Sequence, residues 1–115
     1  MSIAGCDPEY TFEDLGNAIR KIRVDLGIPI DFDGMKIRSW RDRATGPRKC
    51  CALGRSRYSA IDGPGTDGVL VYIKPVVCGD EPPDILNYAA ASPQFPHEPT
   101  SDQWFSESQF ESYRM

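Results

Sequence analysis

The sequence has no apolar run that approaches the length of about 18 residues needed to cross a bilayer. Its first ten residues contain neither the basic segment nor the apolar segment of a secretory signal. Internal repeats and low-complexity segments are also missing. We therefore expect a single unit of fold without a signal peptide or a transmembrane segment, in a cytoplasmic location.

Histidine and paired cysteines are scarce. His97 is the only histidine, and none of the four cysteines, Cys6, Cys50, Cys51 and Cys78, forms a CxxC pair. A zinc site would need these thiols to converge from distant points, and no carboxylate–histidine group has metal-ligand spacing. We expect no metal and no cofactor, and we expect reduced thiols that are partly buried as small apolar side chains.

The chain is acidic, with a formal net charge of −4 and a pI of about 4.9. This balance argues against a nucleic-acid partner and against strong attraction to anionic membranes. Residues 36–55 are a local exception, with seven basic side chains against Asp42. This stretch could meet phosphate headgroups, but a solvated face or loop is the favoured interpretation.

The best helix is predicted over Thr11–Leu26. Apolar residues recur there at the spacing of one helical face, namely Phe12, Leu15, Ile19, Ile22 and Leu26. Thr11 is a candidate N-cap, and Gly27 is placed to end the helix.

Three strands are predicted after this helix. A short edge strand over 28–32 contains Pro29, and two longer arms over 50–61 and 69–77 flank a Gly-rich turn at 62–68. The two arms predict a β-hairpin. The apolar residues of 36–49 recur with neither helical nor strand spacing, so we expect irregular structure there.

Two further helices are predicted in the last third of the chain. Asp80 is a candidate cap for one, with Pro82 and Pro83 in the first turn. Ser106 and Gln109 form a capping-box pattern for the other. The intervening segment, 93–104, is expected to be a loop.

The last third also contains specific motifs. They read VLVYIKP at 69–75, GDEP at 79–82, FPHE at 95–98 and FESYR at 110–114, together with Thr100, Asp102, Gln103 and Phe105. This pattern resembles the C-terminal end of large bacterial patatin-like phospholipases. The resemblance spans nearly the whole chain and is strongest over 69–115. Residues 2–8 also resemble the tail of a strand in that family, so we expect a part of a longer protein.

The resemblance implies an α/β or α+β fragment. Residues 1–115 would be a single partial domain, a partial patatin-like core with three to four strands, two or three helices and an incomplete sheet. Patatin-like hydrolases cleave lipid esters with a serine in a GxSxG elbow and an aspartate in a DG[GA] motif. No serine here has the flanking glycines, and the pairs Asp62-Gly63 and Asp67-Gly68 are followed by proline and valine. We expect no catalytic residue in this chain.

The neighbourhood of His97 allows three interpretations. Ser101 and Asp102 lie close in sequence, but sequence neighbours seldom have triad geometry, and the patatin dyad uses no histidine. A structural role for His97 and Glu98 is favoured, and a loop with Asp102 and Trp104 on the lipid-access side of a parent enzyme stays open. The aromatic residues of this region suit core packing better than a membrane-interface belt.

Two functional hypotheses follow. In the first, the chain is the C-terminal part of a patatin-like acyl hydrolase, inactive alone, that meets lipid or a membrane surface through its parent. In the second, it is a non-catalytic module or remnant gene product that binds lipid or a protein.

Overall fold

The computed structural model describes residues 7–39, 41, 42, 46, 48–99 and 101–114. The elements run in the order α1 (Glu13–Leu26), β1 (Ile30–Phe32), β2 (Cys51–Ser56), α2 (Ser59–Asp62), β3 (Gly68–Ile73), α3 (Pro83–Ala91) and α4 (Glu107–Arg114). Helices and one small sheet are thus mixed, as the predicted α/β or α+β class requires. No helix among these residues is long and apolar enough to cross a membrane.

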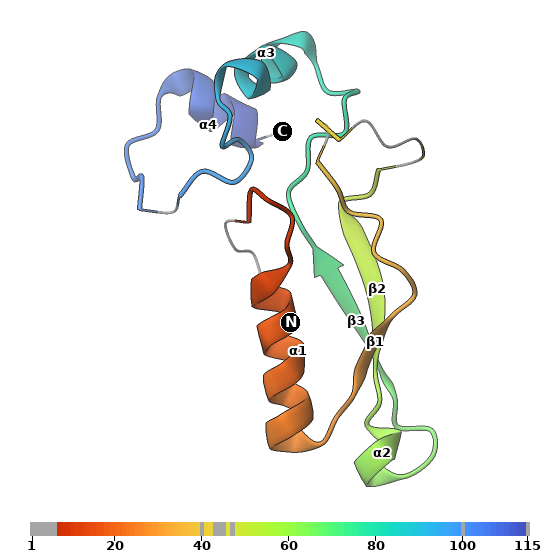
Figure 1. Ribbon diagram of the computed structural model, residues 1–115. Coiled ribbons are helices and arrows are strands. Elements are labelled where there is room, and N and C mark those ends of the chain that lie inside the picture. The colour runs from red at the N-terminus through yellow and green to blue at the C-terminus, as the bar shows by residue number, and fades with distance from the viewer. Residues whose placement is uncertain (1–6, 40, 43–45, 47, 100, 115) are drawn as a thin grey trace.

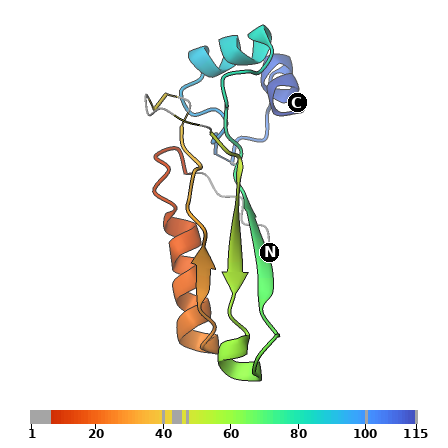
Figure 2. The ribbon, with the colours of Figure 1, turned by 90° about the vertical axis from the view of Figure 1, so that its right-hand side faces the viewer.

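The sheet has three strands in the order β1-β2-β3, and both pairs are antiparallel. The helix α1 runs alongside the sheet, and α3 and α4 lie together at the end opposite α2 (Figures 1 and 2). The molecule is elongated, with principal extents of 51 × 34 × 21 Å.

The first helix ends as predicted but begins differently. Gly27 adopts a left-handed conformation with φ 66°, and its N–H donates to the carbonyl of Arg23 at 3.1 Å. At the other end, the predicted cap at Thr11 is wrong, because the helix starts at Glu13 after Phe12. The Asp7 carboxylate accepts from the N–H groups of Thr11 and Phe12 and so holds the turn before the helix, while no side chain caps the helix itself.

The predicted hairpin is present as β2 and β3, but both arms are shorter than expected. The first arm ends at Ser56, because the N–H of Ser59 donates to the Asp67 carboxylate and the chain turns into the short helix α2. The second ends at Ile73 rather than at residue 77. The edge strand β1 covers only Ile30–Phe32 of the predicted stretch.

Two apolar clusters hold the fold. The first joins α1 to the sheet through Leu15, Ile37, Ala52 and Tyr72. The second sits at the C-terminal end and contains Val77, Ile85, Ala89 and Phe95. The described residues of 36–49 form no helix or strand, as predicted, yet Ile37 is buried in the first cluster.

The last two helices differ in how well their starts were predicted. Asp80 does not cap α3, which begins at Pro83 without a side-chain cap. The capping box of α4 is confirmed, since the Gln109 N–H donates to Ser106 Oγ at 3.2 Å and the Ser106 N–H donates to Gln109 Oε1 at 3.4 Å.

Candidate functional site

Glu98 joins the two C-terminal helices. Its carboxylate accepts from the Tyr88 hydroxyl at 2.9 Å and from Gln109 Nε2 at 2.8 Å, and its N–H donates to the Tyr113 hydroxyl at 3.2 Å. Tyr88 belongs to α3, whereas Gln109 and Tyr113 belong to α4. The structure therefore places this predicted site residue at the centre of a hydrogen-bond network between helices.

Asp102 belongs to the same network, whereas the Trp104 side chain does not. Asp102 accepts from Gln109 Nε2 at 3.2 Å and from the Trp104 N–H at 3.2 Å. The Trp104 side chain itself is 91% exposed. Gln109, which is buried, was predicted only as part of the capping box, and this local pattern gave no sign that its amide would bridge two carboxylates.

His97 is buried and sits apart from these carboxylates. The residue is 6% exposed, its ring meets Tyr10 edge to face at 5.2 Å, and its Nε2 has no hydrogen-bond partner. Burial and the nearby positive charge of Lys74 lower the pKa of His97 to about 4. A neutral imidazole whose Nε2 contacts no hydroxyl lacks the geometry of a general base for serine.

A buried ion pair missed by the sequence analysis lies beside His97. Lys74 is only 2% exposed, and its Nζ lies 3.1 Å from Asp7 Oδ2 and 5.1 Å from the centre of the Tyr10 ring. Burial alone would raise the pKa of Asp7, but hydrogen bonds from Phe12, Thr11 and Lys74 outweigh it and lower the pKa. The only available signal was a lysine directly after an apolar strand.

One residue of the basic stretch, Arg41, makes hydrogen bonds to the protein backbone. Its guanidinium donates to the carbonyls of Pro93 at 2.9 Å and Ala89 at 2.8 Å. These bonds tie the irregular segment to the end of α3. Arg41 thus has a structural task, and Arg43 of the same stretch lies outside the described residues.

The cysteines are more exposed than predicted. Cys50, directly before β2, and Cys51, its first residue, are exposed, and Cys78 is half-buried. Cys6 lies outside the described residues.

One group of side chains could approach a metal ion. Ligand atoms of Cys78, Asp80 and Glu81 lie within 4.8 Å of one another. Both Glu81 oxygens already accept backbone N–H groups, from Cys78 at 2.6 Å and Gly79 at 2.8 Å. A stable zinc site needs three or four committed ligands, so this group is better explained as a turn held by Glu81.

The hairpin has a bare apolar face. Leu53, Val69, Val71 and Ile73, which we call the hairpin outer face, are 56%, 78%, 44% and 53% exposed. Leu53 pairs across the strands with Val71, and Cys51 pairs with Ile73, so these residues share one side of the sheet. Tyr72 and Ala52 alternate with them and are buried on the other side.

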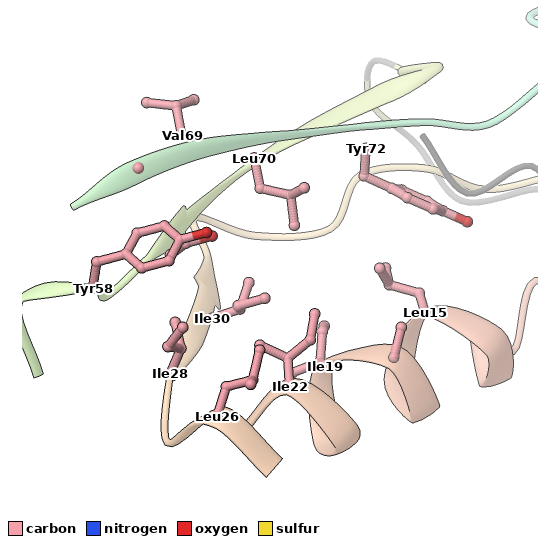
Figure 3. Close-up of a pocket in the computed structure, with 13 residues that line it drawn as sticks. Leu15, Ile19, Ile22, Leu26, Ile28, Ile30, Tyr58, Val69, Leu70 and Tyr72 are labelled. Carbon is pink, nitrogen blue, oxygen red and sulfur yellow. The ribbon is translucent and has the colours of Figure 1, made fainter. Parts of the chain in front are cut away.

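That other side contains the helix–sheet groove, a cavity of about 270 Å³ between α1 and the strands. Figure 3 shows Leu15, Ile19, Ile22 and Leu26 of the helix opposite Leu70 and Ile30 of the sheet, while Val69 points away. The lining residues are Leu15, Ala18, Ile19, Ile22, Leu26, Ile28, Ile30, Ser56, Tyr58, Gly68, Val69, Leu70 and Tyr72. The lining residues that the structure describes are mostly apolar and include no carboxylate, amine or guanidinium.

No protein-family profile matches this sequence, no curated protein matches it, and no solved structure matches the chain.

Proposed function

We propose that this chain is the C-terminal, non-catalytic part of a patatin-like lipid acyl hydrolase. In this proposal the hairpin outer face docks against the catalytic part of the enzyme. Two kinds of support come together: the motifs at 69–75, 79–82, 95–98 and 110–114, which resemble that family, and the apolar surface that β2 and β3 leave bare.

The hairpin outer face is the observation that carries the proposal. The strand β3 reads GVLVYI and contains no charged residue, a pattern typical of strands covered on both faces. The helix α1 covers only one side. Burying one valine, leucine or isoleucine side chain contributes about 1.5–3 kcal/mol, so covering the four outer residues would stabilise a complex by several kcal/mol.

The positions of the motif residues fit a supporting role. Lys74 of the first motif is in a buried ion pair, Glu81 of the second holds a turn, and Glu98 and Tyr113 of the last two bond to each other. None of these contacts leaves a nucleophile beside a base. The motifs would therefore maintain the shape of this part while the chemistry takes place elsewhere.

The parent enzyme would carry the reaction. Its serine would attack the lipid ester, its aspartate would act as the base, and a Gly-rich loop would hold the oxyanion. In this proposal the parent is cytoplasmic and meets lipid at a membrane surface. This chain reaches the membrane only as part of the parent. The chain alone is expected not to hydrolyse a short-chain ester above the buffer blank.

The experiment is co-purification of this chain with a separately tagged catalytic part encoded beside it. The double variant L53E/V71E is expected to lose the complex and the ester hydrolysis that depends on it. Val24→Glu is the matched control, because Val24 is 72% exposed on α1, away from the hairpin. Retention of the complex by L53E/V71E would overturn the docking face, and a stable chain that binds no such part would favour an independent module.

A further inference from the structure

We propose that the helix–sheet groove binds the hydrocarbon chain of a free fatty acid and leaves its carboxylate at the surface. This inference does not depend on the proposed function, because it requires neither a catalytic part nor an ester substrate.

The lining of the groove selects an apolar, uncharged occupant. Most of its side chains are aliphatic, and among the described residues Ser56, Tyr58 and Tyr72 provide the only side-chain polar atoms. No Asp, Glu, Lys, Arg or His of the described part of the chain lines it. A charged group placed inside would lose its hydration without gaining a partner, so only the apolar part of a ligand fits there.

The sheet covers only part of the apolar stripe of α1, which consists of Leu15, Ile19, Ile22 and Leu26. Leu15 is the only buried residue of this helix, and Leu26, one end of the same stripe, is 58% exposed. Protein interiors are normally packed without spaces of this size, and empty apolar cavities weaken a fold in proportion to their volume. An apolar guest would restore the missing contacts between α1 and β3.

A hydrocarbon chain fits the helix–sheet groove better than a peptide does. An extended peptide brings N–H and C=O groups that need partners, but among the described lining residues only Ser56, Tyr58 and Tyr72 offer side-chain polar atoms. A helix, about 10 Å or more across with its side chains, is too wide for a cavity of 270 Å³. A methylene chain has no polar group to satisfy.

The position of Arg23 favours a carboxylate headgroup. Arg23 is exposed and lies on α1 directly after Ile22 and three positions before Leu26, so it borders the apolar stripe. A guanidinium matches the geometry of a carboxylate. The groove lies between helix and sheet (Figure 3), a position that suits the hydrocarbon chain of one fatty acid molecule that has left a bilayer.

The test is a fluorescence titration of the full chain with dansyl-undecanoic acid, followed by displacement with palmitate. We expect one binding site, and Ala18→Trp, which fills the groove, is expected to weaken binding at least tenfold. Val24→Trp adds the same ring at an exposed position of α1 and is expected to leave binding unchanged. Arg23→Gln is expected to weaken palmitate binding but not the binding of hexadecanol.

A second measurement covers the case in which Ala18→Trp does not fold. In NMR spectra of the native chain, palmitate is expected to shift the amides of α1 and β3 and to leave those of α4 in place. Three results would overturn the proposal: no saturable binding, equal binding by a folded Ala18→Trp variant, or binding only to intact phosphatidylcholine vesicles. A dimer that covers the groove at the same concentrations would also overturn it. None of these results bears on the docking of a catalytic part.

Discussion

Lys74 Nζ lies 3.1 Å from Asp7 Oδ2, although 67 positions separate the two residues. This ion pair connects the end of β3 to the segment that enters α1. Because Lys74 is only 2% exposed and Asp7 15%, the pair is shielded from water and salt. This ion pair thus acts together with the apolar cluster around Leu15 and Tyr72 to position the helix relative to the sheet.

Asp7→Ala is expected to lower the free energy of unfolding by about 3–5 kcal/mol, because it leaves the Lys74 ammonium buried without its counter-charge. It also removes the acceptor for the N–H groups of Thr11 and Phe12. Urea denaturation measures the change. Asp31→Ala is the control, since its ion pair with Arg57 is exposed to solvent and is expected to contribute little. Equal losses in the two variants would contradict the assigned role of Asp7.

His97 is expected to make the fold sensitive to mild acid. Its folded pKa of about 4 lies below the ordinary value of 6.5, so the unfolded chain binds more protons between these values. Stability is fully present above pH 6.5 and is lost as the pH falls toward 4. At pH 4.5 the loss is expected to be about 2–3 kcal/mol relative to pH 7.

His97→Leu separates this effect from other acid effects. The Asp7 carboxyl, whose pKa is lowered, also loses stability in acid, but it does so in both proteins. The native protein should therefore lose about 2–3 kcal/mol more than His97→Leu between pH 7 and 4.5 in matched urea titrations. Parallel pH profiles would show that His97 titrates normally in the folded state.

Glu98→Ala is expected to destabilise the C-terminal end by about 2 kcal/mol, because the Tyr88 hydroxyl loses this acceptor and the buried Gln109 amide keeps only its bond to Asp102. Hydrogen exchange should become faster in α4 and remain unchanged in β2. Glu111→Ala is the control, because Glu111 bonds only to the exposed Arg114 among its described contacts and its loss should change stability by about 0.5 kcal/mol or less. Slow exchange of α4 in Glu98→Ala would refute the bridging role.

Two glycines should respond to alanine in opposite directions. A Cβ at Gly54 would lie 3.0 Å from the Asp31 carbonyl oxygen and 3.0 Å from the Phe32 ring, so Gly54→Ala is expected to destabilise the protein by about 1–3 kcal/mol. A Cβ at Gly16 on α1 meets nothing within 4 Å, and Gly16→Ala should stabilise the helix by about 0.5–1 kcal/mol. Thermal melting measures both, and the same sign for both would contradict the close approach of β1 to β2.

The features that the sequence predicted well are local. The end of α1 at Gly27 and the Ser106–Gln109 capping box depend on residues a few positions apart, and β2 and β3 are consecutive strands joined by a short connection that contains the Gly-rich turn. Spacing and turn chemistry specify such features directly. The mixed fold class followed from the order of these elements.

The features that it missed depend on distant partners. Thr11 and Asp80 are good capping residues, but neither caps its helix: α3 begins without a side-chain cap, and the carboxylate of Asp7 accepts from the turn before α1. A lysine after a strand usually reaches solvent, so nothing local indicated that Lys74 would pair with Asp7. The helix–sheet groove reflects how far α1 stands from the strands, which the apolar spacing of the helix cannot specify.

The most direct test of the proposed hydrolase parentage is the DNA sequence immediately upstream of the codon for Met1, read in all frames. We predict a stretch, in frame or frameshifted, that encodes a GxSxG motif and then a DG[GA] motif. Unrelated sequence at that position would contradict the proposal that this chain is the C-terminal part of a patatin-like acyl hydrolase.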